Sequence, residues 1–236
     1  MYELRRRREL GFTVTELMIV VAILGILSAM AAPSFARYFL REDTRANTQK
    51  IARILSEARQ LAIDRGRNQF VIFSNPLIFQ NPGGGGAPQI ATMVEDVDGD
   101  FLLSAPDLQR PIFAFENTHP NVTAYGAGAA APHGNATFPP EDAAAAAVGP
   151  NLAALAATGR GSTFPNAPFN FNPTVGFNPR GIPVSLATPT NPGSGAGAVY
   201  ITDNDKSVYA VILLPLGGVR VRALQPNANP AQTVWR

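Results

Sequence analysis

The chain has 236 residues, of which 46% are hydrophobic and 15% charged, so it can form one packed domain. It contains no cysteine, which excludes disulfides and cysteine-based metal sites or nucleophiles. Its formal net charge is +2, but residues 12–236 alone carry 15 basic and 15 acidic residues. This balance argues against a generally basic nucleic-acid-binding protein.

The most informative stretch is residues 5–33. In chain order it holds four arginines, a first glutamate, a glycine, a phenylalanine, a second glutamate, sixteen uncharged residues and a proline: Arg5–Arg8, Glu9, Gly11, Phe12, Glu16, 17–32 and Pro33. As a helix, residues 12–32 would be about 31 Å long, which matches a hydrocarbon core of about 30 Å. The arginines predict a cytoplasmic N-terminus and an exported remainder. Two alternatives stay open: a secretory signal cleaved after Ala29-Met30-Ala31, and a plain signal anchor.

Glu16 is the feature that a plain anchor does not need. A carboxylate within a membrane span costs about 2.5–3.5 kcal/mol at the centre on insertion scales, and less near the end. The nearest basic residue downstream is Arg37, so the helix offers no basic partner. Cleavage between Gly11 and Phe12 would create an α-amino group with a pKa of about 7.7–8.0, which is largely protonated. Such an amine on a neighbouring subunit could neutralise Glu16.

Together, Gly11, Phe12, Glu16, the basic leader, the apolar run and Pro33 resemble the class III leader of type IV pilins and pseudopilins. The resemblance implies that a prepilin peptidase cleaves after Gly11 on the cytoplasmic face and that the Phe12 amine is methylated. It also implies that Glu16 guides docking into a helical filament. Proline at the twenty-second residue after the cut is a usual family feature, and Pro33 is predicted to kink the helix.

The resemblance and the apolar pattern together predict an α+β, pilin-like fold. Its parts are a cleaved leader, a transmembrane or filament-core half-helix, an amphipathic half-helix and a β-rich head: 1–11, 12–33, 34–65 and 66–236. Apolar residues from Ile51 to Ala62 recur at helical spacing, so a long N-terminal helix is expected to pack on an antiparallel sheet. Gly66 is a natural stop.

Period-two and β-branched patterns predict the strands of the head. They are expected at 69–73, 77–79, 89–94, 198–202, 207–214 and 219–224. Residues 118–197 are rich in Ala, Gly and Pro and have few branched residues, so most of this stretch is interpreted as a long surface insertion. Deleting it is then expected to leave the head folded.

An acidic run follows the third predicted strand. Asp96, Asp98 and Asp100 occupy alternate positions, and Asp107 falls at position twelve when Asp96 is position one, which is the spacing of a calcium loop. Position six is Phe101, where that loop needs glycine. The three alternating aspartates are therefore weak metal candidates, an acidic turn is the favoured interpretation, and no cofactor is predicted.

The C-terminal part resembles the GspH/FimT branch of the pseudopilins. The resemblance rests on Phe177-Asn178-Pro179-Arg180-Gly181 and on Gly217-Gly218-Val219-Arg220-Val221-Arg222. Some FimT-type pilins bind DNA through arginines near the C-terminus, and Arg220 and Arg222 would share one strand face. Val219 departs from the family pattern, which has arginine directly after glycine. These arginines are weak DNA-binding candidates, and two solvated residues are the favoured interpretation.

No catalytic motif is recognisable: His119 and His133 lie beside prolines, and no nucleophile elbow or metal-ligand spacing occurs. The sequence therefore predicts a structural protein and not an enzyme, namely a minor pilin or pseudopilin that primes or caps a type IV pilus. A minor pseudopilin of a type II secretion system and a DNA-receptor pilin remain alternatives. The expected partners are prepilin peptidase, other major and minor pilins, an inner-membrane assembly platform and the membrane, with nucleic acid the weaker alternative. The expected location is the inner membrane with a periplasmic head, then the filament.

Overall fold

The computed structural model describes residues 12–73, 90–102, 107–114, 123–124, 133–158, 161–165, 174–203, 207–225 and 234–236. The chain divides into two compact units, Met1–Phe39 and Leu40–Arg236, which we treat separately as the first and second units. One helix, α1 (Val14–Arg65), contributes to both. It ends at Gly66, whose φ of 63° is the left-handed conformation that closes many helices.

Within the first unit, α1 exposes large apolar side chains on every side. Those more than half exposed include Leu17, Met18, Ile19, Val20, Ile23, Leu24, Ile26, Leu27 and Met30. In the described part of the chain, no single helix is long and apolar enough to cross a membrane; Val14–Met30 and Ser34–Arg65 meet the length and composition criteria only as a pair, bent by 42°. The break between these two segments contains Pro33.

The strands of the second unit form two five-stranded antiparallel sheets. The first has the order β3 (Leu108–Ala114), β2 (Ile90–Glu95), β1 (Gln69–Phe73), β5 (Thr174–Phe177) and β6 (Pro183–Val184). The second has the order β10 (Val234–Trp235), β9 (Val219–Gln225), β8 (Val208–Leu213), β7 (Gly197–Thr202) and β4 (Thr123–Ala124). Two short helices, α2 (Ala145–Val148) and α3 (Leu152–Thr158), complete the described elements.

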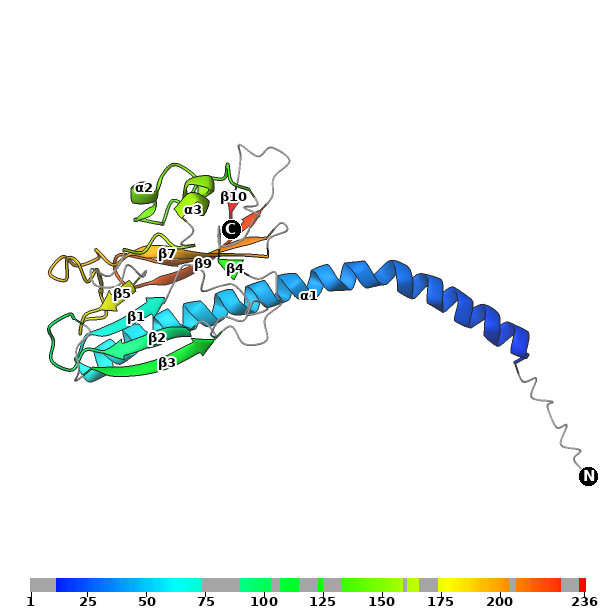
Figure 1. Cartoon of the computed structure of the whole chain (residues 1–236), viewed down its shortest axis with the longest axis horizontal. Coiled ribbons are helices and arrows are strands. Elements are labelled where there is room, and N and C mark those ends of the chain that lie inside the picture. The colour runs from blue at the N-terminus through cyan, green and yellow to red at the C-terminus, as the bar shows by residue number, and fades with distance from the viewer. Residues whose placement is uncertain are drawn as a thin grey trace, which may run out of the picture. The chain divides into compact units, whose positions relative to one another are not determined.

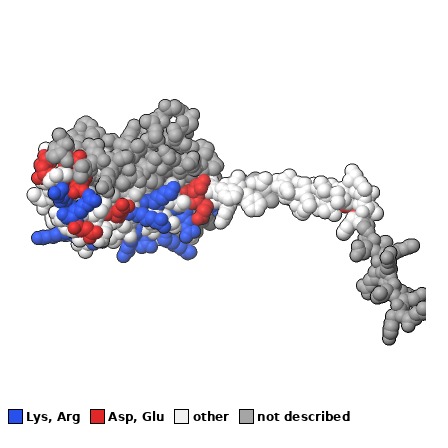
Figure 2. All heavy atoms as spheres, turned by 90° about the horizontal axis from the view of Figure 1, so that it is seen from below, with Lys and Arg blue, Asp and Glu red and all other residues white. Residues whose placement is uncertain are grey.

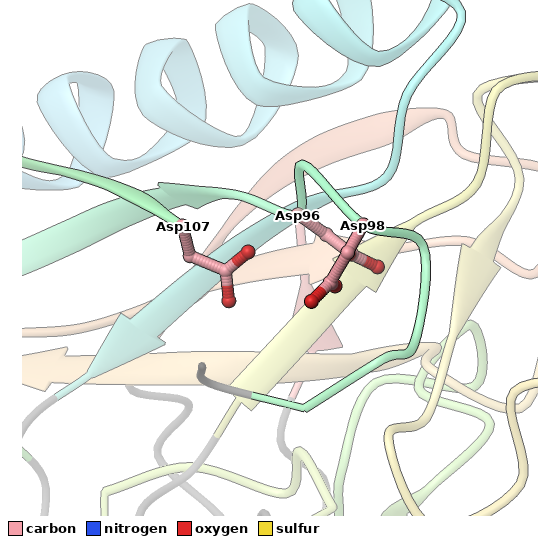
Figure 3. Close-up of side chains that lie close together, drawn as sticks. All are labelled: Asp96, Asp98 and Asp107. Atoms are coloured by element: carbon pink, nitrogen blue, oxygen red, sulfur yellow. The ribbon is translucent and has the colours of Figure 1, made fainter. Parts of the chain in front are cut away.

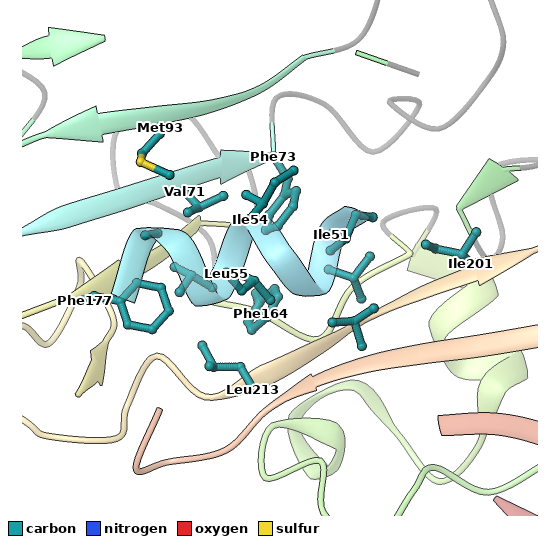
Figure 4. Close-up of a cluster of buried hydrophobic side chains, with 14 of the residues drawn as sticks. Ile51, Ile54, Leu55, Val71, Phe73, Met93, Phe164, Phe177, Ile201 and Leu213 are labelled. Carbon is teal, nitrogen blue, oxygen red and sulfur yellow. The ribbon is translucent and has the colours of Figure 1, made fainter. Parts of the chain in front are cut away.

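The main core lies where α1 passes between the two sheets (Figure 1). Its helical members recur at intervals of three and four residues and form one apolar stripe, Ile51, Ile54, Leu55, Ala58 and Ala62. Figure 4 shows this stripe with Val71, Phe73 and Met93 of the first sheet on one side and Leu213 of the second sheet on the other. The helix is therefore buried by both sheets at once.

The outer face of the second sheet is buried as well. Alternation along β7 turns Val199 and Ile201 toward α1, and turns Ala198 and Tyr200 to the opposite face. On that face they join a second apolar cluster with Leu152 and Leu155 of α3, both fully buried. We call residues 133–158 the cap, because they supply the covering side of this cluster.

The α+β architecture and its antiparallel sheets confirm the fold expected from the sequence. The long helix and strands β1, β2, β7, β8 and β9 lie within a residue or two of their predicted positions. The strand predicted at 77–79 lies outside the described residues. The structure differs from expectation within 118–197: the cap packs into a core, and β5 is an inner strand of the first sheet between β1 and β6. Deleting 118–197 is now expected to unfold the second unit.

Truncating Leu152 to alanine tests whether the cap is part of the fold. A buried leucine replaced by alanine typically costs about 2–5 kcal/mol through lost contacts and the remaining cavity. We expect Leu152→Ala to lower the melting temperature by several degrees, measured by circular dichroism on the full chain in detergent. Leu102→Ala is the matched control, since Leu102 is 53% exposed. Equal melting of both variants would show that the cap is dispensable.

Candidate functional site

The first turn of α1 is closed by a reciprocal pair of side chains. The backbone N–H and the hydroxyl of Thr13 both donate to Oε2 of Glu16, at 2.9 Å each. In return, the backbone N–H of Glu16 donates to Oγ1 of Thr13 at 3.2 Å. This is a capping box, in which two helix-terminal donors are satisfied by residues three apart. The Thr-x-x-Glu signature of such a box is present at residues 13–16, whereas a basic group was the partner expected for Glu16.

Of the two residues at the predicted cleavage site, the structure describes Phe12 but not Gly11. Gly11 and the leader 1–11 lie outside the described residues. Phe12 is 87% exposed and directly precedes the capping threonine. A cut before Phe12 would therefore put the new amino group one residue from the capping box that holds the Glu16 carboxylate.

The acidic run forms a turn after β2, drawn in Figure 3. Carboxylate oxygens of Asp96, Asp98 and Asp107 lie within 4.8 Å of one another, whereas Asp100 is not in this group. However, Asp96 accepts from the backbone N–H of Gly99 at 2.6 Å and from Nδ2 of Asn68 at 2.8 Å. Both carboxylate oxygens of Asp96 therefore accept hydrogen bonds that close a tight turn, as the favoured interpretation expects. The weak metal assignment of this run stays a prediction.

The two C-terminal arginines share one carboxylate partner. Arg220 contacts Oε1 of Glu141 at 3.4 Å, and Arg222 forms an ion pair with the same oxygen. The Arg222 side chain is the largest cause that holds the pKa of Glu141 below its usual range. Both arginines do share one face of β9, as predicted, but that face meets the cap. A nucleic-acid phosphate would have to compete with Glu141.

Comparison with known proteins gives matches to part of the chain. The family model "Prokaryotic N-terminal methylation motif" matches residues 6–32. Residues 6–32 carry a type IV pilin signal. Three Dichelobacter nodosus proteins, each named "Type IV major fimbrial protein FimA", are 45% identical over 51 residues, which is 22% of this chain and 28% of the relative. The match thus spans little more than a quarter of these relatives' length, and no solved structure matches.

Beyond this pilin signal, the two glycine motifs of the C-terminal part meet at one end of the second unit. Nε of Arg59, from α1, donates to the carbonyl of Gly181 at 3.1 Å. Gly217 lies against both groups, so a Cβ at this residue would collide with the Gly181 carbonyl and with Arg59. Both glycines have positive φ, 71° and 85°. Arg59 therefore ties the turn after β5 to the turn after β8, a role that no sequence motif indicated.

A buried carboxylate holds the cap to the second sheet. Asp142 accepts from the Tyr200 hydroxyl at 2.7 Å and from the Thr163 hydroxyl at 3.0 Å. Burial is the largest influence on this carboxyl and raises its pKa, although the hydrogen bonds from Tyr200 and Thr163 act in the opposite direction. Burial, together with the charge of Asp142, also raises the pKa of Tyr200 far above its usual range. All three side chains are buried, so we interpret the network as a structural link between the cap and the second sheet.

The raised pKa of Asp142 gives a stability effect of defined sign. A carboxyl that binds its proton more tightly when folded makes unfolding easier as the pH rises from the ordinary aspartate pKa, about 3.9, through the raised value. The wild type should lose this contribution over that window, whereas Asp142→Asn has no proton to release. We expect the deficit in unfolding free energy of Asp142→Asn to be larger at pH 4 than at pH 7. Urea unfolding at both values measures it, and a deficit that grows with pH would contradict the assignment.

Proposed function

We propose that this protein is a structural subunit of a type IV pilus, cleaved between Gly11 and Phe12 and methylated at Phe12. The observation that carries the proposal is the capping box at the start of an exposed apolar helix, within residues that match the N-terminal methylation motif. It supports a role in which the helix begins at the cut and presents the Glu16 carboxylate beside the new amino group. Before assembly, the subunit would sit in the inner membrane with a cytoplasmic N-terminus and a periplasmic second unit.

The finer proposal is a minor subunit that primes or caps the filament. It is supported by the GspH/FimT-like turns, which Arg59 holds together, and by a cap that covers the outer face of the second sheet. A type II secretion pseudopilus would use the same helix and processing, so it remains the alternative within the class. DNA reception is less favoured, since Glu141 already pairs with Arg220 and Arg222.

Two substitutions separate processing from assembly. Gly11→Ala should block cleavage by removing the residue after which the peptidase cuts, and the protein should keep the mobility of the precursor on a gel. Glu16→Ala should be cleaved normally but reduce the amount of this protein in sheared filaments by at least tenfold.

Thr13→Ala is the matched control for Glu16→Ala. It removes the N-cap, at a typical cost of about 1 kcal/mol, but it keeps the carboxylate. If Glu16 acts through its charge on a neighbouring subunit, Thr13→Ala should still enter filaments at near wild-type levels. Equal loss with both variants would reduce the role of Glu16 to helix capping, and normal assembly of Glu16→Ala would remove its assembly role.

A further inference from the structure

The cap presents a three-residue modification motif on its surface. Asn135-Ala136-Thr137 has the form Asn-x-Thr with x other than proline, which is the acceptor motif for N-linked sugars in exported proteins. Both polar members are exposed, whereas Ala136 between them is buried. Neither polar side chain forms a hydrogen bond to another described residue. The amide of Asn135 is therefore accessible, and a sugar attached to it would extend into solvent.

The backbone of the motif is tied to the rest of the second unit. The carbonyl of Ala136 accepts from the backbone N–H of Leu152 in α3 at 2.9 Å. The carbonyl of Thr137 accepts from Nε1 of Trp235 at 2.8 Å. Only backbone groups of the motif take part in these bonds, so a sugar on Nδ2 of Asn135 would displace neither of them. The folded cap can thus carry the modification unchanged.

The exposed surface of the cap is short of polar groups. Besides the two polar members of the motif and Thr158, every exposed residue of the cap is an alanine or a proline: Pro140, Ala143, Ala146, Ala147, Pro150, Ala153 and Ala157. Of its two carboxylates, Asp142 is buried and Glu141 is paired with the arginines of β9. By contrast, Figure 2 shows many basic and acidic side chains on the side of the second unit opposite the cap. An N-linked sugar is bulky and solubilising, so it would hydrate this alanine-rich surface.

The sequence holds one further motif of this form, Asn121-Val122-Thr123. Asn121 lies outside the described residues, but Thr123 belongs to β4 and pairs with Thr202 of β7. A strand in a ladder holds its backbone extended, whereas Asn135 lies in a turn. Surface loops are more mobile than the elements they connect, so an enzyme reaches them more easily. The structure therefore favours the motif in the cap.

We propose that Asn135 is an N-glycosylation site, modified by a glycosyl diphosphate whose carrier is a polyprenyl lipid or a nucleoside. The inference goes beyond the proposed pilus function and rests on it only for the export of the second unit.

The transfer joins the side-chain amide to the sugar. Nδ2 of Asn135 forms a bond to the anomeric carbon of the donor, and the bond from that carbon to the phosphate oxygen breaks. The electron pair of the broken bond stays on the leaving diphosphate, and one amide proton passes to a base of the transferase. The hydroxyl of Thr137 is the second group of the motif that the transferase reads. Both groups can enter the enzyme while the exported chain is still unfolded.

Mass spectrometry of the full-length protein tests the site. The protein is purified in detergent from membranes of the cells that naturally make it. Cleavage after glutamate releases residues 117–141, which contain both motifs, and fragmentation of this peptide assigns the modified residue. We expect a sugar on Asn135 and not on Asn121. Blocking the loading of sugars onto polyprenyl lipids identifies the donor, since the sugar is lost with a lipid carrier and kept with a nucleoside carrier.

Three substitutions separate the motif from its surroundings. Asn135→Gln removes the acceptor and Thr137→Val removes the hydroxyl, so each should lower the occupancy of the site by at least tenfold. Thr137→Ser keeps a hydroxyl and should keep the sugar. Asn191→Gln is the matched control, because Asn191 is exposed but is followed by proline and glycine, and it should leave the occupancy unchanged.

An unmodified Asn135 in the wild-type protein, a sugar on Asn121 alone, or equal occupancy of Thr137→Val and Thr137→Ser overturns the proposal. Occupancy is measured on protein taken from membranes, so it does not depend on filament assembly. Absence of the sugar therefore contradicts this inference alone, whereas the Gly11 and Glu16 experiments test the pilus function.

Discussion

The second unit depends on the burial of one helical stripe by two sheets. Ile51, Leu55, Ala58 and Ala62 are fully buried, and the small alanines let strands approach α1 closely. Since each sheet buries only part of the stripe, neither sheet covers the helix alone. Burial of apolar surface contributes about 25 cal/mol per Å² to the free energy of folding. Most of the stability of a protein helix comes from such packing of its apolar face and not from intrinsic helix propensity. The two sheets are accordingly held in fixed positions through their shared contact with α1.

Polar contacts hold the ends of the two sheets together and hold the cap on the second sheet, because apolar packing alone is not directional. The Arg59 bond to Gly181 and the close packing of Gly217 align the ends of the two sheets at the hairpin tip. On the outer face, Asp142 accepts hydrogen bonds from Tyr200 and Thr163, and these bonds favour the observed position of the cap. A buried polar group left without partners is costly, and a displaced cap would lose these bonds. In a chain without cysteine, such bonds take over the positioning that disulfides supply in many exported domains.

The elements predicted correctly are those whose residues show a helical or strand periodicity within one segment. The apolar run, the helical spacing after Ile51 and the β-branched C-terminal segments indicated α1 and strands β7 to β9, because each of these elements shows its own period in the sequence. Strand β3 contains Pro111 and β10 has only two residues, so neither has a readable pattern. The cap was misleading because alanine-rich, proline-flanked sequence resembles a loop, and its burial depends on an aromatic surface supplied by Tyr200 from far along the chain.

The residues of the candidate site also differ in whether their roles depend on local sequence or on long-range contacts. The roles predicted for Gly11 and Glu16 rest on spacing along one segment and stay predictions, whereas the contacts of Arg59 and the pairing of Glu141 with Arg220 and Arg222 depend on long-range contacts. The division also bears on assembly. An apolar helix leaving lipid for a bundle of similar helices gains little hydrophobic free energy, because lipid tails are as apolar as leucine. In the proposed pilus subunit, specificity would then come from the charge of Glu16 and from contacts of the second unit, where both shape and sign can distinguish one neighbour from another.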